Sequence, residues 1–205
     1  MFFFLVVSIH AQQKIVVDLT GKGNFTSIQS AVNSLSDSAK KERIIFIKNG
    51  IYKEKIFLTK HNVVLEGEDK KNTIIIQSIA RDEFRCNAEN DWGVATLNLS
   101  GNDITLKNLT ITNNYGFENN KEVIIACLND TVIQQKTVRK DGHQMALRTF
   151  ATTRLKVLNC ILKAYGGDTV SPWNVEDGMF YFKDCEIEGG VDFYCPRGWA
   201  YAENC

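Results

Sequence analysis

Three segments of the sequence end in the same way: LKVLNC at residues 155–160, MFYFKDC at 179–185 and WAYAENC at 199–205. Their final cysteines lie 25 and 20 residues apart. An earlier segment, ITLKNL at 104–109, follows the same pattern with leucine in place of cysteine. A repeat of this length, built from short strands, is typical of a solenoid in which each coil buries its inward side chains against its neighbours.

The rest of the chain consists largely of short apolar runs separated by glycine, asparagine and aspartate, which predict strands. The runs lie at 15–17, 44–47, 63–65, 73–76, 95–99 and 104–106. One segment differs, because Thr26 and Ser27 precede apolar residues at 28, 31, 32 and 35, the spacing of an amphipathic helix with a Ser/Thr N-cap. We therefore expect an all-β protein, a right-handed parallel β-helix with a short N-terminal capping helix. A β-sandwich is the main alternative, but it does not explain the repeat.

Composition limits the location and partners of the protein. Its 205 residues suffice for one domain with a core, and 24 Lys and Arg balance 24 Asp and Glu. No overall field therefore attracts nucleic acid or a membrane surface. The apolar run MFFFLVVSIHA at 1–11 is too short to span a bilayer and is typical of a signal peptide without its basic segment, although a buried first strand is the alternative. We expect a signal peptide at 1–11 and one domain at 12–205 in a secreted or periplasmic, monomeric protein.

The six cysteines show no CxxC pair and no metal-binding spacing with the three histidines, so we expect no metal or other cofactor. Cys160 and Cys185 either stack as small buried hydrophobic residues or form a disulfide between neighbouring coils. Cys195 stands apart and is a candidate free thiol.

The repeat also singles out three polar residues, Gln144, Asp168 and Asp192, each 24 residues from the next. Residues one period apart in a coil stack lie above one another, about 4.8 Å per coil. Two carboxylates that close disfavour each other's ionisation, which gives one acid and one nucleophile or base. The alternative is that both aspartates only form glycine-rich turns.

Several motifs, taken together, resemble those of the pectin methylesterases (pectinesterases). Residues 15–56 look like the opening of that family, including its G-x-Y-x-E element at Gly50, Tyr52 and Glu54. The similar motifs that follow are LKNLTITNNYG at 106–116, GHQMALR at 142–148, GDTV at 167–170, and YFKDC at 181–185 with Val191, Asp192 and Phe193. The resemblance runs from about residue 15 to residue 205.

The resemblance implies a right-handed parallel β-helix that hydrolyses galacturonate methyl esters without a metal. By motif position, Asp192 would attack the ester carbonyl and form an acyl-enzyme. Asp168 would protonate the departing methanol and then accept a proton from water. Gln144 would help to hold the negative tetrahedral oxygen.

The chain departs from the family pattern in three places. The family's glutamine before the acid aspartate, an oxyanion donor, is Gly167 here, although a backbone N–H of the Gly166–Gly167 pair is a potential substitute. Asp192-Phe193 is followed by YCPR at 194–197 rather than I-F-G. The family's later arginine and tryptophan have no counterpart before Cys205, which favours an incomplete β-helix or an inactive relative.

We expect pectin or a related uronic-acid polysaccharide as the partner. The residues expected to bind it lie around the two aspartates: Tyr165, Gly167, Trp173, Phe193, Tyr194 and Arg197. The aromatic residues alternatively pack in the core or rim, and Arg197 is alternatively a solvated loop charge. The insertion at 116–141 is expected to cover the groove or to form a plain surface excursion. Two other functions stay open: a non-catalytic glycan-binding β-helix, and a β-helix polysaccharide lyase or glycoside hydrolase.

Overall fold

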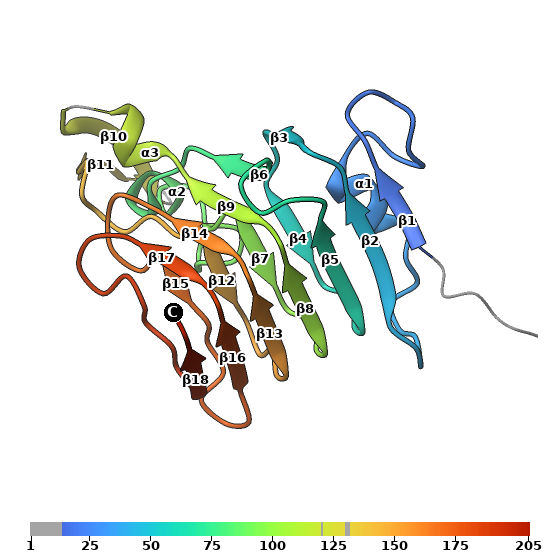
Figure 1. The fold of residues 1–205 in the computed structure, drawn as a ribbon. Helices are drawn as coiled ribbons and strands as arrows, with labels where there is room; N and C mark the ends of the chain where they lie inside the picture. The colour runs from blue at the N-terminus through green and yellow to red at the C-terminus, as the bar shows by residue number, and fades with distance from the viewer. Residues whose placement is uncertain (1–13, 120, 130–131) are drawn as a thin grey trace, which may run out of the picture.

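The chain winds into a stack of coils in which strands pair with the strands one coil away (Figure 1). The computed structural model describes residues 14–119, 121–129 and 132–205, so the predicted signal segment at 1–11 lies outside the described residues. Within the described part of the chain, the strands of the stack form three parallel sheets of seven, five and four strands. The parallel β-helix predicted from the repeat is therefore confirmed.

Each sheet collects one strand from successive coils. The seven-stranded sheet consists of β1 (Lys14–Val17), β2 (Arg43–Ile47), β5 (Val63–Gly67), β8 (Ile104–Lys107), β13 (Leu155–Leu158), β16 (Met179–Lys183) and β18 (Trp199–Glu203). The five-stranded sheet consists of β3 (Gly50–Tyr52), β6 (Thr73–Gln77), β9 (Thr110–Asn113), β14 (Ile161–Lys163) and β17 (Glu186–Glu188). The four-stranded sheet consists of β4 (Ile56–Leu58), β7 (Leu97–Leu99), β12 (Leu147–Thr149) and β15 (Val170–Ser171).

The core is a set of columns running along the stack, because strands in register point equivalent side chains inward. One column joins Ile45, Leu65, Leu106, Val157 and Phe182, all fully buried. Burial of an aliphatic or aromatic side chain contributes about 1.5–3 kcal/mol. These columns are therefore the main source of stability.

The Asn/Asp-Cys repeat marks the corner between the seven- and five-stranded sheets. Asn108, Asn159 and Asp184 each turn this corner in the left-handed region, with φ of 54°, 51° and 54°. Asparagine and aspartate tolerate that region better than other residues with a side chain. The cysteines that follow, Cys160 and Cys185, are buried free thiols. Of the two alternatives, stacking is therefore observed and a disulfide is not.

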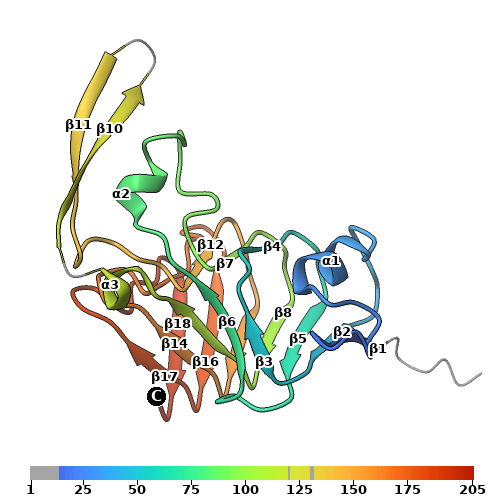
Figure 2. The same ribbon diagram turned by 90° about the horizontal axis from the view of Figure 1, so that it is seen from above.

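Helix α1 (Ile28–Asn33) lies against the N-terminal end of the stack, beside β1 and β2 (Figure 2). The predicted cap is present, since the Ser27 side chain accepts a hydrogen bond from the N–H of Ser30. The Glu54 carboxylate also accepts bonds from the Ser27 hydroxyl and from the N–H groups of Ile28 and Gln29, at 2.8, 3.0 and 3.0 Å. Glu54 therefore ties the helix start to the first coils.

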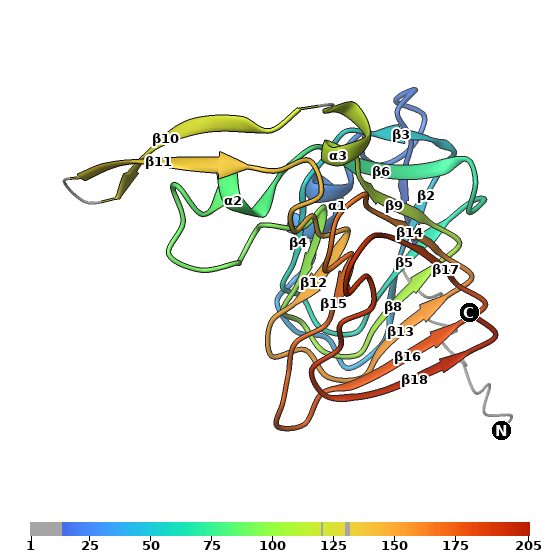
Figure 3. The same ribbon diagram turned by 90° about the vertical axis from the view of Figure 1, so that its left-hand side faces the viewer.

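Two excursions leave the stack between the five- and four-stranded sheets. The first, between β6 and β7, contains α2 (Arg81–Phe84). The second, between β9 and β12, contains α3 (Tyr115–Glu118) and an antiparallel hairpin of β10 (Val123–Asn129) and β11 (Val132–Val138). We call this hairpin the arm; it projects away from the stack beside α2 (Figures 2 and 3). The sequence analysis predicted neither one-turn helix.

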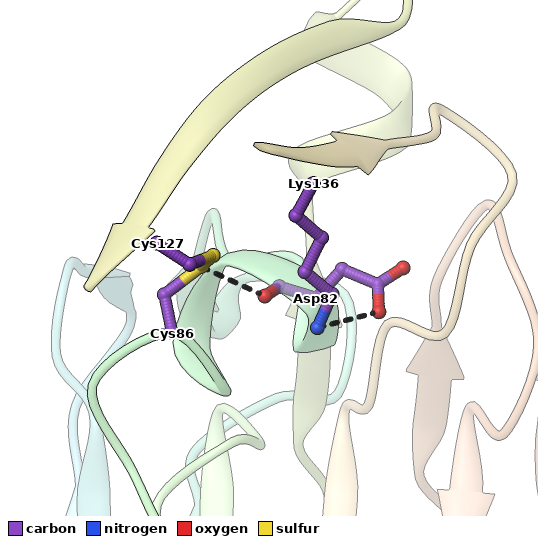
Figure 4. Close-up of a disulfide and its surroundings, with 4 residues drawn as sticks. All are labelled: Asp82, Cys86, Cys127 and Lys136. Atoms are coloured by element: carbon purple, nitrogen blue, oxygen red, sulfur yellow. Dashed lines mark hydrogen bonds and ion pairs between the residues drawn. A yellow bond between two sulfur atoms is a disulfide. The ribbon is translucent and has the colours of Figure 1, made fainter. Parts of the chain in front are cut away.

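A disulfide fixes the arm to the α2 excursion. Cys86 and Cys127 form this bond across a sequence separation of 41 residues (Figure 4). Lys136 of β11 adds an ion pair to Asp82 of α2, with 3.2 Å between Nζ and Oδ1.

In the part of the chain that the structure describes, no helix is long and apolar enough to cross a membrane.

Candidate active site

Asp168 and Asp192 occupy the same kind of turn on adjacent coils. Both follow a strand of the five-stranded sheet, and both have left-handed backbones, with φ of 56° and 52°. The N–H of Asp168 donates to the carbonyl oxygen of Asp192 over 3.2 Å. The two aspartates are thus direct neighbours along the stack, as the 24-residue spacing predicts.

The two carboxylates have different surroundings. The side chain of Asp168 is only 17% exposed, and its Oδ1 lies 3.8 Å from Nε2 of the half-exposed His143. Asp192 is exposed to solvent. The pair therefore consists of one partly enclosed carboxylate and one open carboxylate at the same edge of the four-stranded sheet.

Cys195 lies beside Asp168. Burial is the main cause that raises the pKa of the Cys195 thiol, and the nearby Asp168 charge raises it further. The sulfur accepts a hydrogen bond from Nη1 of Arg197 at 3.2 Å. Cys195 therefore connects Arg197 to the site, in its protonated form near neutral pH.

Gln144 is close to Asp168 in the backbone, but its side chain faces inward. The N–H of Gln144 donates to the carbonyl of Gly167 at 3.0 Å. The side chain is fully buried, and its Oε1 accepts from the N–H of Gly116 at 2.8 Å. Its Nε2 donates to the carbonyl oxygens of Lys140 and of Gly142, the latter at 3.2 Å. Both amide hydrogens are thus used by the backbone, so a bond to a substrate oxygen requires one of them to be released.

The glycines before Asp168 are required by close backbone approach. A Cβ on Gly166 would lie 1.8 Å from the carbonyl oxygen of Gly142, and one on Gly167 would lie 2.6 Å from that of Val191. A glutamine at position 167, as in the family motif, therefore does not fit this backbone. Among the described residues, no hydrogen bond uses the N–H of Gly166 or Gly167.

Arg148 of β12 is a component of the site that the sequence analysis quoted in a motif but gave no role. It points to the outer face of the four-stranded sheet, since the register places its neighbour Leu147 in the core. Its side chain is 6% exposed, and Nη1 donates to the Ser171 hydroxyl at 2.6 Å. Its Nε finds no partner among the described residues. Burial is the main cause that lowers its pKa, whereas the nearby Asp91 and Asp168 charges favour its cationic form.

The predicted substrate-binding residues differ in their exposure to solvent. Trp173 and Arg197 lie side by side, with the guanidinium carbon 5.4 Å from the ring centre, and Phe193 is 43% exposed. Tyr165 is 39% exposed, and the Lys140 ammonium lies 4.3 Å above its ring. These residues are available to a ligand.

Tyr194 requires a correction. It is in register with the buried Val170, and its ring meets Phe182 edge-on at 5.4 Å, inside the stack. Its hydroxyl is buried without a hydrogen-bond partner among the described residues, and burial raises its pKa. Tyr194 is therefore partly buried and packs against the core, which is the alternative interpretation for the aromatic residues, and its hydroxyl is not available to a ligand.

Among the described residues, no group of three or more His, Cys, Asp or Glu side chains is arranged to hold a metal ion. The chemistry that the arrangement offers is that of two neighbouring carboxylates with nearby cationic and aromatic side chains.

The fold and these residues define a β-helix protein with a carboxylate pair on one outer edge, and comparison with known proteins identifies the family. The pectinesterase family pattern matches residues 14–163. A protein of Arabidopsis thaliana named "Putative pectinesterase 11" is 29% identical over 193 residues, which is 92% of this chain and 45% of that protein. The chain belongs to the pectinesterase family.

Solved structures share this fold. A pectin methylesterase from carrot superposes with a TM-score of 0.72 at 22% identity, covering 95% of this chain and 52% of that chain. A pectin methylesterase in complex with a hexasaccharide gives 0.70 at 26% identity, covering 94% and 54%. These neighbours confirm the right-handed parallel β-helix. The chain spans about half the length of the relatives that it matches.

Proposed function

We propose that this protein hydrolyses the methyl esters of polygalacturonate, releasing methanol. The observation that carries the proposal is the pair of left-handed turns that set Asp168 and Asp192 on adjacent coils, joined by a 3.2 Å backbone hydrogen bond. Membership of the pectinesterase family supports the choice of ester. The solved hexasaccharide complex of a relative supports a carbohydrate ligand.

In the proposed reaction, a carboxylate oxygen of Asp192 attacks the ester carbonyl carbon, and the carbonyl electrons move to its oxygen. The tetrahedral intermediate collapses, and Asp168 gives its proton to the departing methoxide, which leaves as methanol. Water, losing a proton to Asp168, then attacks the acyl-enzyme and restores both aspartates. The openness of Asp192 suits a nucleophile, and the partial burial of Asp168 suits a group that exchanges protons with substrate.

The negative oxygen of the tetrahedral intermediate is stabilised by hydrogen-bond donors. Gln144 can supply one only by releasing its 3.2 Å bond to the Gly142 carbonyl or its bond to the Lys140 carbonyl. The N–H groups of Gly166 and Gly167 lie in the turn that carries Asp168 and are the alternative. One oxyanion donor typically contributes about 10²–10³ in turnover.

Tyr165, Phe193 and Trp173 would bind the sugar rings, because exposed aromatic rings suit the apolar faces of sugars. Gly167 would leave room beside Asp168, and Arg197 would contact the uronate.

We further propose that the protein is secreted, acts as a monomer on pectin or a related uronate polymer, and has a signal peptide at residues 1–11. The Cys86–Cys127 disulfide supports an oxidising compartment.

The test is methanol release from esterified pectin by wild type, Asp192→Asn and Asp168→Asn. Each site variant is expected to lose roughly 10⁴-fold or more in kcat/KM, the scale seen for loss of a nucleophile. Asp184→Asn is the matched control, since Asp184 also has a left-handed backbone but lies at a corner remote from the site in the coil. Asparagine is compatible with that backbone, so all three variants should keep the wild-type melting temperature. Unchanged methanol release in Asp192→Asn refutes the assignment, and binding of pectin without methanol release by wild type favours a non-catalytic β-helix.

A further inference from the structure

One side chain joins the two ends of the second excursion. Where the excursion leaves the stack, the N–H of Gly116 donates to Oε1 of Gln144 at 2.8 Å. Where it returns, Nε2 of Gln144 donates to the carbonyl oxygens of Lys140 and Gly142. We call these three backbone positions the neck of the excursion. Gln144, the proposed oxyanion donor, is fully buried and bonded to the neck in this conformation.

The residue that accepts one of these bonds also covers a ring that is expected to bind sugar. The ammonium group of Lys140 lies 4.3 Å from the centre of the Tyr165 ring. Lys136, earlier in the same excursion, forms an ion pair with Asp82, whereas in the described part of the chain no ion pair involves Lys140. The Lys140 ammonium can therefore leave the ring without breaking a salt bridge.

Gly116 shows how closely these groups pack. A Cβ at this position would lie 2.5 Å from Cβ of Tyr165, 2.6 Å from the carbonyl oxygen of Lys140 and 2.8 Å from Oε1 of Gln144. The ring-bearing residue, the carbonyl and the amide therefore meet at one backbone position. Because close-packed regions contain few voids, a displacement of Lys140 is expected to change the hydrogen bond that its carbonyl accepts from Gln144.

A sugar and the Lys140 ammonium compete for Tyr165. Sugar rings stack on aromatic faces, and Lys140 occupies one face of this half-exposed ring. A sugar that stacks on that face displaces the ammonium. The ligand thereby favours a conformation in which Lys140 has moved, which is the condition for a ligand to shift a conformational equilibrium.

We propose that Lys140 couples sugar binding to the availability of the oxyanion donor. A sugar that stacks on Tyr165 displaces the Lys140 side chain, the Lys140 carbonyl moves with it, and the Gln144 amide is released to bond the ester oxygen. Without a sugar on Tyr165, Gln144 stays bonded to the neck. Lys140 is thus a positioning residue that acts through Gln144. The inference rests on the proposed function for the ester and for Tyr165 as a sugar contact.

Turnover of a short and a long substrate tests this coupling. Methanol release is measured for galacturonic acid methyl ester, a monomer expected to leave Tyr165 to Lys140, and for fully methyl-esterified trigalacturonate. Lys140→Ala should raise kcat for the monomer about two- to fivefold, the range expected for loss of one exposed cation–π contact. Its kcat for the trimer should stay within about twofold of wild type, because the sugar already displaces the ammonium. Lys140→Arg keeps a cation over the ring and should match wild type on both substrates.

Lys163→Ala is the matched control. The Lys163 ammonium lies 5.7 Å from the centre of Phe117, the ring that meets Tyr165 edge-on, but Lys163 accepts no bond from Gln144. This variant should leave both kcat values within about twofold of wild type. In a Gln144→Ala background, Lys140→Ala should give no gain on the monomer. An equal gain in Lys163→Ala, a gain that persists without Gln144, or no gain in Lys140→Ala overturns the inference.

Hydrogen exchange of the Gln144 side-chain amide, followed by NMR, tests the coupling without turnover. Unesterified trigalacturonate should speed this exchange about fivefold or more in wild type, and less than about twofold in Lys140→Ala, where no ammonium is displaced. The Asn98 amide is the internal control, since it is also fully buried and bonds the carbonyls of Ile56 and Ala95. No ligand effect on Gln144, or an equal effect in both proteins, overturns the coupling. If wild type releases no methanol but the ligand still speeds Gln144 exchange through Lys140, the proposed function fails and the coupling stands.

Discussion

Replacing Gly167 tests whether the turn that carries Asp168 has room for a side chain. A Cβ at this position would lie 2.6 Å from the carbonyl oxygen of Val191. Even close C–H···O contacts have carbon–oxygen distances of about 3.3–3.6 Å, so the two turns must separate by roughly 0.7 Å. The obstacle is the backbone carbonyl of Val191, which cannot rotate out of the way as a flexible side chain could.

We therefore expect Gly167→Ala to lower the free energy of unfolding by about 2 kcal/mol, within the usual range for overpacking. In a protein of this size that corresponds to a melting temperature lower by about 4–8 °C. Gly142→Ala is the matched control in the same region, since its nearest contact would be 3.3 Å, to the carbonyl of Arg139. It should melt within about 2 °C of wild type.

The same displacement should also lower the rate of ester hydrolysis, because Val191 directly precedes the proposed nucleophile Asp192. Gly167→Gln, which introduces the glutamine of the family motif, is therefore expected to reduce methanol release and not to increase it. A Gly167→Ala protein that melts with wild type, or a Gly167→Gln protein with higher turnover, would show that the close approach does not constrain this turn.

Two further predictions concern the cysteines. Replacing Cys86 and Cys127 together with serine should lower the free energy of unfolding by about 2–4 kcal/mol, because the disulfide closes a long loop, and urea titration at fixed pH measures the loss; identical midpoints would contradict it. Burial raises the pKa of Cys160 to about 12, so this thiol should resist alkylation in the native protein at pH 8 and react after unfolding. The contribution of this pKa shift to the free energy of unfolding is complete below the unfolded-state pKa of about 8.5 and is lost as the pH rises towards 12. Alkylation of Cys160 in the native protein as fast as that of a free peptide thiol would contradict the prediction.

The sequence predicted the features that the coil period controls. The inward side chains of successive coils and the neighbouring turns of Asp168 and Asp192 follow from the repeat, because each coil adds one strand to each sheet. The N-cap of the helix is predictable from the local sequence, because the Ser27 side chain accepts its hydrogen bond from Ser30, three residues further along the chain.

The period could not predict where every side chain points. Gln144 shares the spacing of the aspartates, but its amide turns inward to bond the backbone at 116, 140 and 142. The sequence predicts that Tyr194 binds the polysaccharide, although its register with Val170 points its ring towards the core; a difference of one residue along a strand exchanges the faces. The Cys86–Cys127 disulfide lies outside the repeat, where spacing carries no information.

The two excursions leave the stack at the same corner, yet the strands on either side keep their register. Leu97 pairs with Leu147 across the whole arm, and Ile161 pairs with Thr110 just as closely. Residues added at this corner therefore leave the strand register of the coils unchanged. Insertions, deletions and substitutions can therefore change the length and side chains of these excursions during evolution. The coils that hold the two aspartates keep their positions.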